Sequence, residues 1–321
     1  MNLKDIVRKA AKPIVIGVAA SILAGSAFGC YNTTPNAEPM LETKSYPIID
    51  MHAHWQPDIS TELMLENMSR ANVVKAVIMP NSGHPYDAAQ SLASQYPDKF
   101  VAFVGFQNKE WIQQRPGFID NYVEQALQTN EFKGLGEVLL RHYAIPQRNA
   151  PDINIPATSD SVYHMLELAA KYNVPIVIHM EAEETTVKEL EKLLKDNPTP
   201  KVIWAHAGRA ESSTIERLFE TYGNLYIDLS ALDPSRIYGR EKNPITTENG
   251  ILKSEWKNLL VKYRDRIMTG SDTPFPDLWK KYVYVDIMDS QRALLEQLPD
   301  NVAEKIAYKN ASVMLGIDLQ K

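Results

Sequence analysis

The chain has 321 residues, of which 44% are hydrophobic, and it carries a formal net charge of −6 with a pI near 5.7. That length and hydrophobic content can bury a large core, which excludes a chain that is disordered over most of its length. The negative charge offers no basic surface to offset phosphate groups, so we expect a small-molecule substrate and no nucleic-acid partner.

The first 29 residues have the pattern of an export signal. Four lysine and arginine residues within the first 12 positions precede an apolar stretch that starts at Pro13 and runs into small residues. This charge-then-apolar order is typical of a secretory signal peptide. The stretch falls short of the roughly 20 strongly apolar residues that a spanning helix needs. We therefore predict a signal peptide over residues 1–29.

Cys30, the only cysteine, follows this apolar stretch directly. The run "SAFGC" resembles the lipobox of bacterial lipoproteins, with Ala27 and Gly29 as the small residues and Cys30 as the lipidation site. The alternative is an ordinary signal peptide cleaved near Ala27, with Cys30 incidental. A single cysteine excludes a disulfide framework. We expect an exported protein, lipid-anchored to a bacterial membrane on the periplasmic or cell-surface side, with residues 30–45 as a polar tether.

From residue 46 to residue 321 short apolar runs alternate with longer amphipathic segments. Strict alternation of strands and helices predicts right-handed crossovers and a parallel sheet, and eight units suit a closed (β/α)₈ barrel of the TIM type. A doubly wound α/β sheet is the alternative, but it would place a glycine-rich turn after the first strand, where "HAHW" stands instead. The eight candidate strands are residues 47–52, 73–80, 100–107, 132–140, 174–180, 201–207, 224–230 and 265–272.

The predicted strands end in residues that bind metals. In a barrel of this kind the chemistry lies at the carboxyl ends of the strands. Imidazole and carboxylate groups suit Zn²⁺ and similar divalent ions. Strand side chains alternate between faces, so two histidines one residue apart on the first strand point the same way. The residues at these ends are His52, His54, Glu137, His179, His206, Ser230 and Asp272.

These motifs resemble the amidohydrolase superfamily, in particular its amidohydrolase-related (amidohydrolase 2) branch. The resemblance covers the chain from Tyr46 to Leu319, and the runs that carry it are "IIDMHAH", "VPIVIHM", "KVIWAHAG", "IMTGSDTPFP" and "EKIAYKNASVMLGI". The resemblance implies that His52, His54 and His179 bind a divalent metal, for which zinc is the first choice. It implies that His206 binds metal or polarises the substrate, and that Asp272 contacts the metal and moves a proton.

Glu137 leaves the number of metals open at one or two. Many members with two metals carry a carboxylated lysine at the end of the fourth strand, whereas "KGLGEVLLRH" has Glu137 there, as members with a bridging glutamate do. A salt bridge from Glu137 to Arg141 or Lys133 is the alternative to a metal bridge.

The resemblance predicts a metal-dependent hydrolase that attacks an ester, lactone, amide or related bond, with Asp272 and His206 as catalytic residues. A non-oxidative decarboxylase, a carbon–carbon lyase on the same scaffold, is the first alternative; it would need a cationic clamp such as Arg141 or Arg209. A non-catalytic ligand-binding surface lipoprotein is the second, but it would need no acid–base carboxylate beside a metal. Arg141, His142 and Ser230 are candidate substrate-binding residues. The sequence leaves open whether the protein forms a homo-oligomer.

The lipid anchor can be tested at Cys30. If Cys30 is the lipid acceptor, Cys30→Ala should leave an uncleaved precursor or move the protein out of the membrane fraction, as cell fractionation and mass spectrometry of the N-terminus would show. Unchanged membrane attachment with a fully processed N-terminus would refute the lipobox interpretation.

Overall fold

The structure is a computed structural model that describes residues 46–55, 57–80, 87–106, 109–232 and 245–319. The predicted signal peptide, the tether and Cys30 lie outside the described residues. Within the described part, no helix combines the length and the apolar character needed to cross a membrane.

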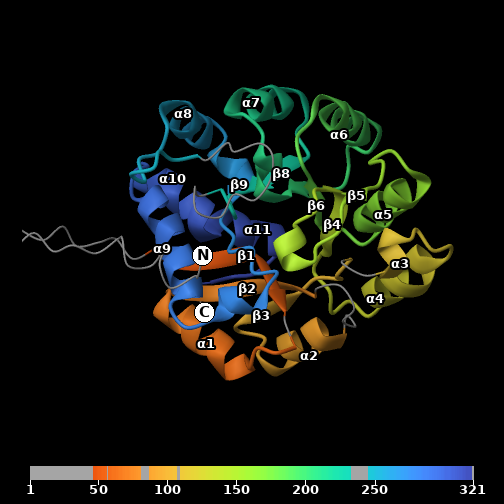
Figure 1. The fold of residues 1–321 in the computed structure, drawn as a ribbon, viewed down its shortest axis with the longest axis horizontal. Helices are drawn as coiled ribbons and strands as arrows, with labels where there is room; N and C mark the ends of the chain where they lie inside the picture. The colour runs from red at the N-terminus through yellow and green to blue at the C-terminus, as the bar shows by residue number, and fades with distance from the viewer. Residues whose placement is uncertain (1–45, 56, 81–86, 107–108, 233–244, 320–321) are drawn as a thin grey trace, which may run out of the picture. The chain divides into compact units, whose positions relative to one another are not determined.

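The strands form the parallel sheets of a TIM-type barrel (Figure 1). One sheet has the order β1-β2-β3, and the other has the order β5-β4-β6-β7-β8-β9, in which only the short β5 is antiparallel to its neighbour. The strands are β1 Ile48–Trp55, β2 Val73–Pro80, β3 Phe100–Ala102, β4 Leu135–His142, β5 Ile153–Asn154, β6 Ile176–Met180, β7 Val202–Trp204, β8 Leu225–Asp228 and β9 Ile267–Met268.

Backbone hydrogen bonds close the two gaps between these sheets. Beyond β3, Val104 forms a parallel bridge with Leu135 of β4, and its N–H donates to the Gly134 carbonyl at 3.0 Å. At the other gap the Met51 N–H of β1 donates to the Thr269 carbonyl after β9 at 3.0 Å. A doubly wound sheet has two free edges, so this closure rules out the alternative fold and confirms the predicted barrel.

Helices connect the strands and lie around them (Figure 1). The predicted amphipathic segments are found where expected: in α5, for example, Val162, Leu166 and Ala169 are buried. The helices are α1 Thr61–Arg70, α2 Asp87–Gln95, α3 Lys109–Ile112, η3 Ile119–Glu124, α4 Gln125–Gln128, α5 Asp160–Lys171, α6 Glu184–Asp196, α7 Ser212–Thr221, α8 Ser254–Lys262, α9 Val283–Leu295, α10 Asp300–Glu304, η8 Lys305–Lys309 and α11 Asn310–Leu315. Short helical turns are η4 Pro146–Arg148, η5 Ala205–Arg209, η6 Arg264–Arg266 and η7 Pro276–Trp279.

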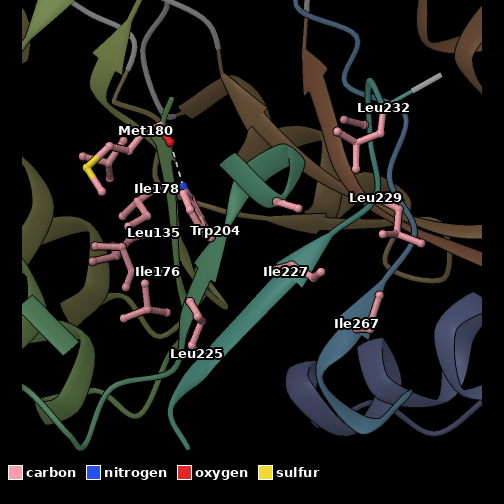
Figure 2. Close-up of a cluster of buried hydrophobic side chains, with 14 of the residues drawn as sticks. Leu135, Ile176, Ile178, Met180, Trp204, Leu225, Ile227, Leu229, Leu232 and Ile267 are labelled. Carbon is pink, nitrogen blue, oxygen red and sulfur yellow. Dashed lines mark hydrogen bonds between the residues drawn. The ribbon is translucent and has the colours of Figure 1, made fainter. Parts of the chain in front are cut away.

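The larger hydrophobic core lies between strands and helices. Figure 2 shows part of it, where Trp204 of β7 lies between Ile178 of β6 and Ile227 of β8. Trp204, at the end of β7, is fully buried here, and its indole N–H donates to the Met180 carbonyl at 2.7 Å. Burying this surface supplies the main driving force that holds the helices on the strands.

A second core fills the barrel itself, and one irregularity in β1 places the histidines above it. Ile49 and Met51 belong to this inner core, whereas Ala53 packs in the outer one. The pairing of β1 with β2 shifts register between Asp50 and Ala53. Such a bulge switches the inward-facing positions from odd to even numbers. As a result, His52 and His54 face the barrel interior above Ile49 and Met51.

Two predicted strands have different ends in the structure. β4 runs on to His142, so Arg141 and His142 lie in the strand rather than in a loop after it. β7 ends at Trp204, and His206 lies in the following turn. That turn has left-handed backbone at His206 (φ 56°), Ala207 (φ 49°), Gly208 (φ 60°) and Arg209 (φ 53°).

Gly208 offers a test of this turn. A Cβ at Gly208 would stand 1.9 Å from the Trp204 side chain at a φ of +60°. Steric overpacking and the left-handed backbone should together make Gly208→Ala about 2–4 kcal/mol less stable, as measured by urea unfolding. Gly223→Ala is the matched control because a Cβ there meets nothing within 4 Å; it should change stability by about 0.5 kcal/mol or less. Equal stability of the two variants would contradict the described turn.

Candidate metal centre

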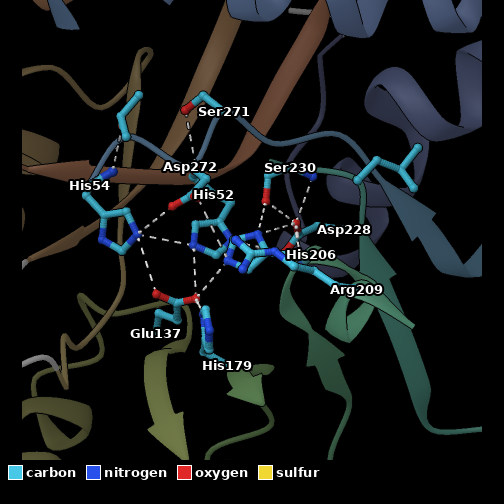
Figure 3. Close-up of polar contacts among 12 residues, drawn as sticks. His52, His54, Glu137, His179, His206, Arg209, Asp228, Ser230, Ser271 and Asp272 are labelled. Atoms are coloured by element: carbon cyan, nitrogen blue, oxygen red, sulfur yellow. Dashed lines mark hydrogen bonds and ion pairs between the residues drawn. The ribbon is translucent and has the colours of Figure 1, made fainter. Parts of the chain in front are cut away.

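His52 and His54 of β1 point their Nε2 atoms at one place (Figure 3). The two Nε2 atoms lie 3.2 Å apart, and both residues are fully buried. Two imidazole nitrogens bound to one tetrahedral metal at 2.0–2.1 Å would stand about 3.3 Å apart. The pair therefore has the spacing of two ligands of a single ion.

Glu137 of β4 lies among the imidazoles of the site. Its Oε1 is 2.8 Å from Nδ1 of His179, 3.2 Å from Nε2 of His206 and 3.5 Å from Nε2 of His52. Its Oε2 is 3.7 Å from Nε2 of His54. Burial would raise the pKa of Glu137, but the facing His179 and His52 hold it well below its usual range. Glu137 is therefore an ionised carboxylate in the middle of the cluster.

Asp272 completes the cluster after β9. Its N–H donates to the His52 carbonyl at 2.6 Å, and its backbone is left-handed with φ 49°. Its Oδ1 is 3.7 Å from Nε2 of His54, and its Oδ2 is 4.0 Å from Nε2 of His206. The Asp272 side chain is 13% exposed, whereas those of His52 and His54 are 0% exposed. Asp272 is thus the member of this cluster nearest to solvent.

Burial and neighbouring charges shift the pKa values of His52 and His54 in opposite directions. Burial lowers the pKa of His54 to about 4, helped by the nearby His52, so His54 is neutral. Burial acts the same way on His52, but Asp228 and Glu137 outweigh it and raise the pKa of His52 well above its usual value. His52 must therefore release a proton when it binds a cation.

Two groups of ligand atoms in this cluster are close enough to hold an ion. One consists of His52, Glu137 and His206, and the other of His52, His54 and Asp272; in each group the ligand atoms lie within 4.8 Å of one another. The donor types and their burial fit a divalent metal. His179 lies outside both groups and reaches the cluster through its contact with Glu137.

Asp228, at the end of β8, stands behind the histidines and was not singled out in the sequence. Its Oδ2 lies 3.0 Å from Nδ1 of His52, and its Oδ1 accepts from the Ser230 hydroxyl. Burial would raise the pKa of Asp228, but the charge of His52 lowers it to about 2. The signal for this residue was an aspartate inside the apolar run "NLYIDLS", because a buried carboxylate needs partners.

The amidohydrolase family profile matches residues 38–317, which is most of the chain. The chain belongs to the amidohydrolase family. A search of the curated proteins found no match.

Solved structures share the fold of this amidohydrolase. An uncharacterised TIM-barrel protein from Bordetella bronchiseptica has a TM-score of 0.57 at 16% identity, covering 80% of this chain and 83% of its own. A dihydroxybenzoic acid decarboxylase from Polaromonas sp. JS666, with bound manganese and an inhibitor, has a TM-score of 0.55 at 13% identity. The match covers 84% of this chain and 97% of the decarboxylase chain. Dihydroorotase from Campylobacter jejuni has a TM-score of 0.51 at 17% identity, and the match covers 86% of this chain and 85% of the dihydroorotase chain. At these identities the likeness establishes the fold alone.

The three candidate substrate-binding residues of the amidohydrolase lie in different surroundings. Arg141 donates to Glu183 at 3.2 Å and to Asp152 at 3.1 Å. The His142 ring lies 5.1 Å from that of His179, its Nδ1 is 3.1 Å from the Pro151 carbonyl, and burial lowers its pKa to about 4. Ser230 is fully buried behind His206, with its Oγ 2.7 Å from Nδ1 of that ring. Their contact with substrate stays a prediction.

A buried ion pair beside His179 is a further feature of the amidohydrolase site. The Arg209 guanidinium donates to Oε1 of Glu181 at 2.8 Å, and that oxygen is 3.4 Å from Nε2 of His179. Within the run "EAEE" that follows His179, Glu183 occupies the N-cap of α6. Glu181, two residues earlier in the same extended segment, faces the site instead.

The metal count tests the role of Glu137. Both ligand groups share His52, whose single free Nε2 lone pair serves one ion, so we expect one metal equivalent in the wild type. Glu137→Gln should still hold one, because His52, His54, His206 and Asp272 remain. Elemental analysis of the two purified proteins measures this. Two equivalents in the wild type that fall to one in Glu137→Gln would identify a bridging Glu137 instead.

Proposed function

We propose that this amidohydrolase is a metal-dependent hydrolase that cleaves an ester, lactone, amide or related bond of a small molecule. The observation that carries the proposal is the position of Asp272, an acid–base carboxylate at the solvent side of a buried group of converging imidazoles. General acid–base chemistry needs a proton-carrying group within reach of both substrate and water.

A divalent metal at this site would supply Lewis acidity and would lower the pKa of water toward neutrality. His52, His54, His206 and Asp272 are the proposed ligands, with Glu137 beside them and His179 joining through Glu137. Zinc suits this nitrogen-rich set, and manganese, which the decarboxylase from Polaromonas sp. JS666 binds, is the alternative. Elemental analysis of the purified protein distinguishes the two.

Asp272 and His206 have separate roles in the proposed reaction. Asp272 takes a proton from the attacking water and later returns it to the leaving group. His206 presents Nε2 on the side of Glu137 and Asp272, since its Nδ1 faces Ser230. That orientation suits a ligand, while the second role predicted for His206, polarising the substrate, would need a proton on Nε2.

The decarboxylase alternative is less well supported by the charges around the site. A substrate carboxylate would need a cationic partner, and the two candidate arginines are both engaged with acidic side chains: Arg141 with Asp152 and Glu183, and Arg209 with Glu181. An anionic substrate would have to compete with these carboxylates. A neutral ester, lactone or amide would not.

The proposal extends to the place of action. With the signal peptide over residues 1–29 and lipidation at Cys30, the hydrolase would act on small molecules outside the cytoplasm, anchored to the membrane through its lipid. The test is the Cys30→Ala fractionation given above, and the mass of the purified protein in solution would show whether it forms a homo-oligomer.

Asp272→Asn tests the proposed function. Three histidines should keep the metal, while loss of the proton acceptor should reduce turnover roughly 10²- to 10⁴-fold. The measurements are metal content and kcat on the substrate found in a panel of esters, lactones, amides and aromatic carboxylates.

Two controls accompany this test. Asp265→Asn makes the same change at an exposed side chain near the start of β9 and should leave both quantities unchanged, whereas the double variant His52→Ala with His54→Ala should lose both. Near-normal kcat in Asp272→Asn would contradict the mechanism, and turnover of the aromatic carboxylates alone would favour the decarboxylase.

A further inference from the structure

Asp228 is a buried carboxylate that contacts two of the proposed metal ligands without facing the metal position. It is 1% exposed and lies at the end of β8, between β1 and the turn after β7. Figure 3 shows it on the far side of the His52 and His206 rings from Glu137. Its two oxygens have separate partners.

The Oδ1 atom of Asp228 accepts three hydrogen bonds. The donors are the His206 N–H at 3.2 Å, the Ser230 N–H at 3.0 Å and the Ser230 hydroxyl. Because the Ser230 hydroxyl donates its hydrogen bond to Asp228, its oxygen accepts a hydrogen bond from Nδ1 of His206 at 2.7 Å. His206 therefore carries a proton on Nδ1, and its Nε2 is available as a ligand.

The Oδ2 atom of Asp228 lies 3.0 Å from Nδ1 of His52. A carboxylate here accepts the Nδ1 proton and keeps it on that nitrogen. Nε2 of His52, which lies 3.2 Å from Nε2 of His54, is then the nitrogen left to bind a cation. Histidine ligands of metals commonly have their second nitrogen held in this way.

We infer that Asp228 is a positioning residue that holds His52 directly, and His206 through Ser230, in the tautomer whose Nε2 atoms bind the metal. The inference rests on the proposed metal-dependent function and adds to it one carboxylate that sets two ligands at once. It also gives Ser230 a role as the link between Asp228 and His206, in place of the substrate contact predicted from sequence.

Asp228→Asn changes this arrangement in a defined way. The amide oxygen should occupy the Oδ1 position, where three donors already point, which turns the NH₂ group toward Nδ1 of His52. His52 must then accept on Nδ1 and carry its proton on Nε2, where it blocks the metal. In the opposite amide orientation the NH₂ group would face those three donors, and the proton position on His206 would be disturbed instead. Either orientation disables one ligand.

The experiment measures Zn²⁺ affinity by competition with a chromophoric chelator, using the full chain and its variants. We expect Asp228→Asn to bind Zn²⁺ about 10- to 100-fold more weakly than the wild type, the range found when such supporting partners of metal ligands are removed. The ¹⁵N chemical shifts of the histidine rings in the Zn²⁺-loaded proteins report the tautomer: in the wild type His52 and His206 should both be protonated on Nδ1, and Asp228→Asn should not retain both.

Asp50→Asn is the matched control. Asp50 of β1 is also fully buried, but it accepts from the N–H groups of His52 and Ser271 and from the Tyr284 hydroxyl, with no imidazole among these partners. The tyrosine hydroxyl can turn to accept from an amide, so Asp50→Asn should keep its Zn²⁺ affinity within about twofold. Ser230→Ala breaks only the link to His206 and should weaken Zn²⁺ roughly 10-fold.

The outcomes separate the two proposals. Wild-type Zn²⁺ affinity in Asp228→Asn, or equal losses in Asp228→Asn and Asp50→Asn, would overturn the inference and leave the proposed function standing. A wild-type protein without affinity for Zn²⁺ or Mn²⁺ would overturn both. If circular dichroism shows that Asp228→Asn does not fold, Ser230→Ala decides: unchanged affinity refutes the link, and weakened affinity with an unchanged fold supports it.

Discussion

The seam between the first and last strands of the barrel is the constraint on which the site depends. Backbone hydrogen bonds from Met51 to Thr269 and from Asp272 to His52 join segments that are about 220 residues apart in the chain. They set the Asp272 carboxylate beside the histidines of β1. Because these are main-chain bonds buried from water, they must be made for the barrel to close at all. The position of Asp272 beside His52 and His54 is therefore a consequence of closure.

The site concentrates ionisable groups that the fold itself does not need. Glu137, Asp228 and Glu181 are buried among imidazoles and one arginine, and taking these paired charges out of water carries a desolvation cost. Apolar residues at these positions would stabilise the barrel at least as well. The cost is understandable if the groups serve a cation, since a metal neutralises carboxylates and takes the lone pairs of imidazoles. The left-handed residues of the turn after β7 are a further cost of the same kind.

Residues on several other elements of the barrel hold the proposed ligands in place. Asp228 of β8 holds His52 of β1 and reaches His206 through Ser230, while Trp279 donates to the His54 carbonyl at 2.9 Å. The rings of His52 and His206 are thereby oriented by residues of other elements, while the bond from Trp279 holds the backbone of His54. A ligand set built on rigid strands and held in this way keeps its geometry without the metal, which lowers the entropic cost of binding it.

The order of elements and most of the proposed ligands could be predicted from the chain alone. Alternating apolar runs and amphipathic segments specify a barrel because they are local patterns, and ligand-type residues at strand ends follow from that periodicity. Asp228, Glu181 and the role of Ser230 could not be read, because their meaning depends on which neighbour each oxygen meets across strands. The bulge that turns His52 and His54 inward and the turn that aims His206 were likewise decided by tertiary packing, since local propensity disfavours left-handed backbone at residues such as Ala207.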